Sequence, residues 1–202
     1  NIAKQIPVIV NDSFRNLTGG TEQEGETLVE QIGKRFIGDA VIIEYFNGVT
    51  IDEAIKSTSE IDNTAAEIVG DEESDTKKAY LIYKWVSKNI EYDFEKAENI
   101  VHNTWKYKSG SIEAFSTRKG ICFDYSCLYI SMCRAVGLKV RLITGLGYSG
   151  TSWGDHAWNQ VWSENEQRWI NLDTTFGSSG KNYFDKPDFF VDHRDGKVQG
   201  EW

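Results

Sequence analysis

The hydrophobic pattern of the chain changes near residue 138 from a helical period to alternation, and this change restricts the possible folds most. Residues 74–90 place Ala79, Ile82 and Val86 on one face of a helix. Beyond residue 138, short apolar or alternating segments typical of strands follow one another at 139–148, 155–162 and 167–176. Because the helices come first and the strands after, the sequence predicts an α+β fold with an antiparallel sheet.

The first 72 residues are acidic and mixed in pattern. A helix is expected over 26–39 and a strand over 40–46. Thr50, with Glu53 three residues later, has the layout of a capping box that begins a short helix. The acidic stretch 70–75 is typical of a surface linker. These features predict an N-terminal extension over residues 1–72, a lid or a pro-segment, before a core over residues 73–202.

Composition excludes some classes of protein. The chain has 202 residues, enough for one large domain, and a net charge of −9. An acidic balance argues against nucleic acid as a partner, because phosphate backbones require a basic surface. No apolar run is long enough to cross a bilayer, and the first residues do not have the layout of a signal peptide.

Three cysteines, Cys122, Cys127 and Cys133, lie in one predicted helix that ends at Gly137. On a helix, a separation of five residues places two side chains about 140° apart around the axis, with a rise of about 7.5 Å. A disulfide requires Cα atoms within about 7 Å, and zinc-type C-x₂-C spacing is missing. Packing in the core and catalysis therefore remain as possible roles for these cysteines, and packing is favoured for Cys127 and Cys133.

Cys122 differs from the other two by its position at the start of the predicted helix, after Gly120. Unsatisfied N–H groups and the helix dipole favour a thiolate there, and the same N–H groups can stabilise an oxyanion. A thiolate nucleophile also needs an imidazole. His156 lies in a strand pattern, and Asp173 follows it by 17 residues with a turn between. Asp173 can orient His156 from a neighbouring strand, or can instead begin an Asx-turn at a strand end.

These segments resemble the transglutaminase-like superfamily of papain-fold cysteine enzymes. The resemblance is carried by "KGICFDYSCLYISMCRAVGLKVRLITG", "DHAWNQVW" and "RWINLDTTF", and it covers residues 75–180. It implies a papain-like core with Cys122 on a central helix packed against an antiparallel sheet. It further implies that Cys122 is the nucleophile, His156 the base and acid, and Asp173 the residue that orients the imidazole.

The resemblance implies acyl transfer from a protein or peptide amide through a thioester, with an amine or water as acceptor and no cofactor or metal. Transglutaminase-like cross-linking or deamidation is favoured, a cysteine protease is the alternative, and an inactive binding or cell-surface module is a third possibility. Trp105, Tyr107 and Trp158 are candidates for the oxyanion hole or the cleft wall, with aromatic packing as the competing interpretation. An extracellular or cell-wall location in a bacterium is expected.

Overall fold

The structure is a computed structural model that describes residues 45–100 and 106–202. The helix predicted over 26–39, most of the strand predicted over 40–46, His102 and Trp105 lie outside the described residues. The helices are α2 (Ile51–Ala54), α3 (Ser59–Val69), α4 (Asp75–Asn89), α5 (Phe94–Asn99), α6 (Ser111–Thr117), α7 (Cys122–Ala135) and α8 (Thr174–Gly177), with a 3₁₀ turn η2 (Phe189–Val191).

The strands fall into three small groups. Short pairs are formed by β1 (Tyr45–Phe46) with β2 (Val49–Thr50), and by β3 (Glu91–Tyr92) with β4 (Lys119–Gly120). The main sheet has the order β7–β6–β5–β8 and contains β5 (Val140–Tyr148), β6 (Trp153–Ser163), β7 (Arg168–Leu172) and β8 (His193–Glu201). All of its pairings are antiparallel, so the predicted α+β class and sheet type are confirmed.

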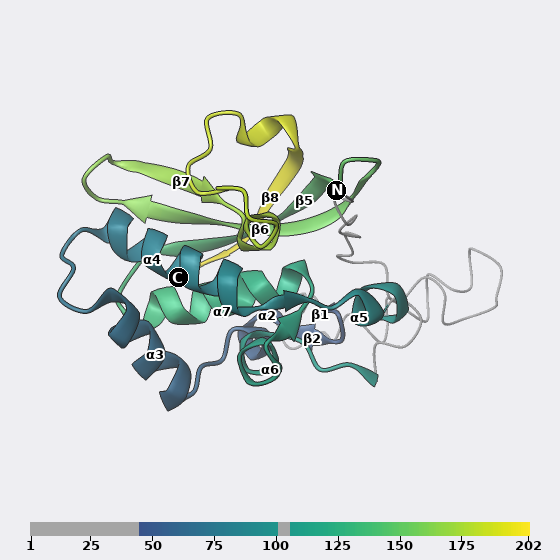
Figure 1. Ribbon diagram of the computed structural model, residues 1–202, viewed down its shortest axis with the longest axis horizontal. Coiled ribbons are helices and arrows are strands. Elements are labelled where there is room, and N and C mark those ends of the chain that lie inside the picture. Colours follow the sequence, from purple (N-terminus) through teal and green to yellow (C-terminus); the bar gives the residue numbers. More distant parts are fainter. Residues whose placement is uncertain (1–44, 101–105) are drawn as a thin grey trace, which may run out of the picture.

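Helix α7 is the centre of the molecule. Its first twelve residues are all buried, with α3, α4 and α6 on one side and the sheet on the other (Figure 1). A helix that is apolar around its whole circumference is stable only inside a core, and the α7 sequence carries charge only at Asp124 and Arg134. Gly137 follows the helix with φ +77°, as expected for a glycine stop.

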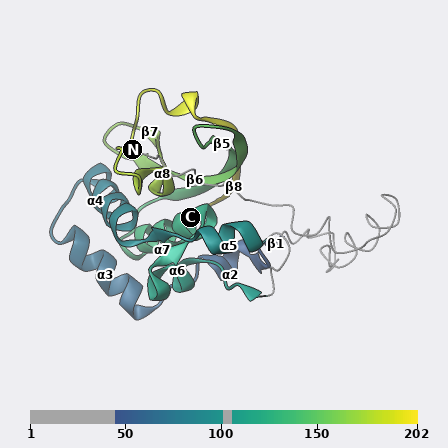
Figure 2. The same ribbon diagram turned by 45° about the vertical axis from the view of Figure 1, so that its right-hand side comes forward.

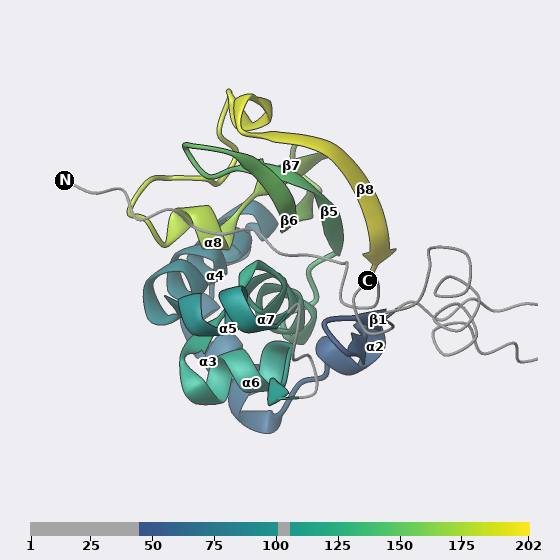
Figure 3. The same ribbon diagram turned by 90° about the vertical axis from the view of Figure 1, so that its right-hand side faces the viewer.

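Helix α8 lies between the helical layer and the sheet (Figure 2). It begins directly after β7, at the segment that the sequence pattern had assigned to a strand. Viewed along the sheet, β8 follows the outer edge beside β5, and the chain ends near α2 (Figure 3). The sheet therefore covers α7, while α8 supports the end of β7.

Several elements differ from the sequence prediction. Residues 91–100, for which no element is predicted from the sequence, contain β3 and α5, and Asp93 caps α5 by accepting a hydrogen bond from the Lys96 N–H at 2.9 Å. Helix α4 is capped by Ser74, whose side chain accepts a hydrogen bond from the Lys77 N–H. Strand β8 was not predicted, because its residues are mostly polar and exposed and show no alternation. The capping box of Thr50 and Glu53 is confirmed.

Residues on both sides of position 72 contribute to one core. Phe46, Ile61 and Ala65 are buried in the same cluster as the side chains of α7 and the sheet. The predicted division of the chain at residue 72 stays a prediction. Within the described part of the chain, no helix is both long enough and apolar enough to cross a membrane.

Candidate active site

Cys122 is the first residue of α7 and is fully buried. The backbone before it is held by Asp124, whose Oδ2 accepts hydrogen bonds from the Ile121 N–H at 2.9 Å and from the Lys96 ammonium at 2.6 Å. The Oδ1 atom accepts from the Gly110 N–H at 2.7 Å. A Cβ at Gly120 would lie 2.7 Å from the Asp124 Cβ, which explains the glycine before the cysteine. The start of α7 is thus a rigid position for a thiol.

Cys127 and Cys133 are buried in the core, as the packing interpretation predicts. Burial raises the pKa of each of these thiols well above its usual range, so neither is a thiolate at neutral pH. All three cysteines are free of disulfides. Only Cys122 stands at a helix N-terminus, where the dipole of α7 favours negative charge.

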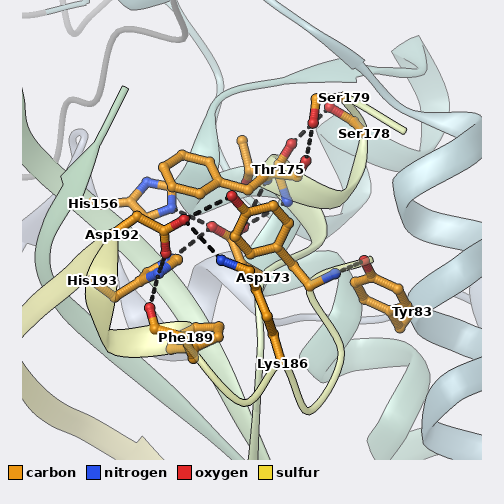
Figure 4. A network of polar contacts seen from close by, with 12 residues as sticks. Tyr83, His156, Asp173, Thr175, Ser178, Ser179, Lys186, Phe189, Asp192 and His193 are labelled. Carbon is orange, nitrogen blue, oxygen red and sulfur yellow. Dashed lines mark hydrogen bonds and ion pairs between the residues drawn. The ribbon is translucent and has the colours of Figure 1, made fainter. Parts of the chain in front are cut away.

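His156 on β6 and Asp173 at the end of β7 form a buried pair (Figure 4). The His156 Nε2 lies 2.6 Å from the Asp173 Oδ2, which confirms that the two side chains are adjacent. The other oxygen, Oδ1, accepts hydrogen bonds from the backbone N–H groups of Thr175 at 2.8 Å and Phe176 at 3.0 Å. The two interpretations of Asp173 are therefore both correct, because one carboxylate caps α8 and orients the imidazole.

The two nitrogens of His156 have different surroundings. Nε2 faces a carboxylate oxygen and therefore carries the proton. Nδ1 is buried and has no hydrogen-bond partner within the described residues. The Phe176 ring stacks on the imidazole at 4.5 Å, and a Cβ at Gly147 would lie 2.8 Å from the imidazole ring. These contacts hold the imidazole ring in place, and its Nδ1 makes no hydrogen bond within the described residues.

His193, the first residue of β8, also contacts Asp173 and was not identified from the sequence. Its Nε2 lies 3.0 Å from the Asp173 Oδ2, and its Nδ1 lies 2.8 Å from the Asp192 Oδ1 and 3.0 Å from the Phe189 carbonyl oxygen. His193 is fully buried although the strand around it is exposed. The neighbouring Asp192 was the only signal in the sequence, and it is too common a neighbour to indicate a site.

The electrostatics of this cluster are set by opposing effects. Burial raises the pKa of Asp173, but the two imidazoles lower it by more than burial raises it. The pKa of Asp173 therefore lies well below its usual range. Burial lowers the pKa of His193, while the carboxylates of Asp173 and Asp192 raise it, giving a pKa of about 9. Asp173 is consequently an anion and His193 a cation at neutral pH.

The same three side chains are the one group within the described residues whose ligand-type atoms could hold a metal ion, since these atoms lie within 4.8 Å of one another. A zinc ion would need each ligand atom at about 2.0–2.2 Å. Here the Asp173 Oδ2 already contacts both imidazole Nε2 atoms by hydrogen bonds. Hydrogen bonding therefore accounts for the arrangement of His156, Asp173 and His193.

A groove of about 890 Å³ borders both halves of the site. Phe176, which stacks on His156, lines it, and so does Tyr92. The pKa of Tyr92 is raised above its usual range by burial and then by the nearby Cys122 thiol. Neither Cys122 nor His156 lines the groove itself, so the groove is related to the site through Tyr92 beside Cys122 and Phe176 on His156.

The aromatic candidates from the sequence have different outcomes. Trp105 lies outside the described residues. Tyr107 is partly buried, packs against the core and does not line the groove. Trp158 is 2% exposed and packs beside both imidazoles. Its ring centroid lies 6.2 Å from that of His156 and 5.1 Å from that of His193. Trp158 therefore supports the histidines by packing, and the groove is walled by other side chains.

Known proteins share sequence similarity with part of this chain. The chain is 32% identical to the kyphoscoliosis peptidase of Mus musculus over 128 residues, which are 59% of this chain and 18% of that protein. It is 28% identical to the peptide-N(4)-(N-acetyl-beta-glucosaminyl)asparagine amidase of Mus musculus over 90 residues, 45% of this chain and 13% of that protein. The chain thus spans less than a fifth of the length of each relative.

Among solved structures, the periplasmic domain of TgpA from Pseudomonas aeruginosa has a TM-score of 0.44 and 17% identity, over 64% of this chain and 48% of that one. A structure of a TGase has a TM-score of 0.46 and 19% identity, over 69% of this chain and 35% of that one. The model of the transglutaminase-like superfamily matches residues 62–174, a span that ends just after Asp173. Since this match covers more than half of the sequence, the chain belongs to the transglutaminase-like superfamily.

Proposed function

We propose that the chain catalyses cysteine-dependent acyl transfer on protein or peptide amides, with Cys122 as nucleophile, His156 as base and acid, and Asp173 as the orienting residue. The observation that carries the proposal is the buried His156 imidazole. Its Nε2 is held by Asp173, while its Nδ1 is left without a hydrogen-bond partner within the described residues. A nucleophile paired with a base that a third group orients is the arrangement that acyl transfer requires.

The reaction begins when the His156 Nδ1 takes the proton of the Cys122 thiol. The thiolate then attacks the carbonyl carbon of the amide, and N–H groups at the start of α7 stabilise the oxyanion. The imidazolium returns its proton to the leaving nitrogen as the C–N bond breaks, which leaves a thioester on Cys122. Asp173, whose pKa lies below its usual range, remains an anion and stabilises the imidazolium throughout.

The acceptor decides between the finer activities. An amine that attacks the thioester gives a cross-link, while water gives deamidation of a glutamine or hydrolysis of a peptide bond. The favoured form is transglutaminase-like cross-linking or deamidation. Cysteine protease activity is the second candidate, supported by the names of the two relatives, a peptidase and an amidase. Both names describe the cleavage of a carbon–nitrogen bond.

The first test is the alkylation of cysteines by iodoacetamide across pH, with peptide mapping by mass spectrometry. Cys122 is expected to react fast near neutral pH, and His156→Ala is expected to slow this reaction by about tenfold or more, because the base that takes the proton of the thiol is then missing. All three cysteines are buried, so Cys127 and Cys133, which have raised pKa values and do not stand at a helix start, are the internal controls. Equal rates at all three cysteines would support an inactive module instead.

The acceptor is identified by three assays on the wild type and on Cys122→Ala. Incorporation of a fluorescent amine into casein reports cross-linking, ammonia release without incorporation reports deamidation, and new peptide termini report proteolysis. A signal that is lost in Cys122→Ala assigns the activity. If Cys122 alone is alkylated fast but none of the three assays gives a signal, the proposal of acyl transfer is wrong for the protein amides tested.

A further inference from the structure

His193 joins the buried carboxylate of Asp173 and the partly buried carboxylate of Asp192 into one chain of contacts. This chain runs from Asp192 through His193 and Asp173 to His156, with the distances of 2.8, 3.0 and 2.6 Å given above (Figure 4). His156 and His193 meet the same oxygen of Asp173, the Oδ2 atom. The orienting carboxylate is thus shared between two imidazoles.

The geometry alone determines the protonation of His193. Its Nε2 faces a carboxylate oxygen, and its Nδ1 faces a second carboxylate oxygen and a backbone carbonyl oxygen. Since all of these partners are acceptors, both nitrogens must donate. An imidazole that donates through both nitrogens is a cation.

The surroundings of His193 strengthen this charge. The Phe189 ring stacks on the imidazole at 3.9 Å, and the Trp158 ring meets it edge-on at 5.1 Å. Charges interact more strongly in such a dry environment than in water. The titratable groups that face His193, directly or through Asp192, are Asp173, Asp192, His156, Tyr183 and Lys186.

We infer that His193 is a positioning residue: a buried imidazolium that shares Asp173 with His156 and thereby keeps His156 a neutral base. This inference rests on the proposed function of His156. With His193 charged, His156 faces a carboxylate already paired with a cation. Without that cation, His156 would face an isolated buried anion and would hold its own proton more tightly.

This role makes a prediction that a packing role does not. His193→Gln can still donate a hydrogen bond but carries no charge. If His193 acts through its charge, the pKa of His156 measured in the variant is higher than that measured in the unsubstituted chain, because a neighbouring cation has been removed. If His193 only packs, its loss loosens Asp173 and lowers the pKa of His156. The two roles therefore predict shifts of opposite sign.

The measurement is an NMR titration of the imidazole nitrogens in the full chain, carried in the Cys122→Ala background. Removing the thiol separates this test from the proposed role of Cys122, which the alkylation assay addresses. Before any substitution at position 193, the spectrum of His193 near neutral pH is expected to show both nitrogens protonated. A neutral His193 at that pH would overturn the inference even if His193→Gln failed to fold.

Asp192→Asn supplies a second variant. It removes one of the two carboxylates that hold the proton on His193, so the pKa of His193 is expected to fall from about 9. The matched control is Asp188→Asn, because Asp188 is 61% exposed and pairs with Lys186 but not with a histidine. Its expected effect on either histidine is negligible. An unchanged His193 in Asp192→Asn, or a lowered pKa of His156 in His193→Gln, would contradict the inference.

Discussion

Asp173 uses both of its carboxylate oxygens, and each oxygen serves a different part of the molecule. One oxygen caps α8, and the other holds two imidazoles. Its charge therefore contributes to folding as well as to the proposed chemistry. The same holds for His193, a fully buried cation that compensates the carboxylates of Asp173 and Asp192.

The raised pKa of His193 predicts a loss of stability in mild alkali. The group has an ordinary pKa of 6.5 and a folded pKa of about 9. A raised folded pKa contributes stability that is fully present below the unfolded pKa and is lost as pH rises through the folded pKa. Urea unfolding is expected to show a free energy that falls between about pH 6.5 and 8.5, by a few kcal/mol at most.

The control for this pH dependence is His193→Gln, in which the fall over the same range should be absent. The range stops at about pH 8.5 because thiols begin to titrate above it. Asp173 affects the stability at acidic pH instead. Its lowered pKa gives stability above its ordinary pKa, and this stability is lost as the pH falls through the lower folded value. A profile of His193→Gln parallel to that of the wild type would contradict the charge assigned to His193.

The proximity of His156 to Asp173 could be predicted, because the two residues lie in strand patterns joined by a short turn. His193 could not be predicted. It belongs to a strand without alternation, at a sheet edge, and its pairing with β5 shifts register twice. Its burial results from η2 and the packing of Phe189, contacts that no local pattern encodes.

At the scale of elements, the start of α7 depends on a buried ion pair. Lys96 from α5 is 4% exposed at its side chain, and Asp124 is not exposed at all. The Lys96 ammonium also donates to the Lys108 carbonyl oxygen at 2.7 Å. The segments on either side of residues 101–105 are thereby tied to the helix that carries Cys122.

Lys96→Met is expected to lower the free energy of unfolding by about 3–5 kcal/mol, because it leaves the Asp124 carboxylate buried without its cation. Urea unfolding at neutral pH checks this value. The matched control is Lys77→Met on α4, where the lysine is 71% exposed and its ion pair with Glu72 is 3.7 Å long. An effect below about 1 kcal/mol is expected there. Similar losses in both variants would refute the structural role of Lys96.

The length and end of α7 follow from its sequence, because a helix-length segment without glycine or proline is closed by Gly137. Helix α5 was missed because its six residues are too few to show a period, and only the cap at Asp93 marks it. The ion pair of Lys96 and Asp124 spans 28 residues. A contact of this kind depends on the tertiary fold and leaves no trace in spacing.

At the scale of the whole molecule, the described residues before position 72 belong to the same core as the segments that carry Cys122, His156 and Asp173. Ile61 and Ala65 on α3 are fully buried, and α3 packs against α7. The region over residues 45–72 therefore acts as part of the scaffold behind Cys122. This arrangement makes the predicted division at residue 72 testable.

A chain that begins at residue 73 is expected to lose cooperative unfolding, because it lacks α2 and α3. In the full chain, Ile61→Ala is expected to cost about 2–5 kcal/mol, as for other buried isoleucines. Ile68→Ala on the same helix is the control, since Ile68 is only partly buried and should cost less. Urea unfolding measures all three proteins. A shortened chain as stable as the full one would show that residues 73–202 form an independent domain.

The clamp around His156, formed by Phe176 on one side and by the bare backbone of Gly147 on another, has a consequence for the speed of the reaction. A side chain that can occupy only one rotamer loses no conformational entropy when the substrate arrives. In the proposed reaction, an imidazole already held by these contacts needs no further ordering, so the entropy cost of fixing it is met once, during folding, and is not repeated in each turnover.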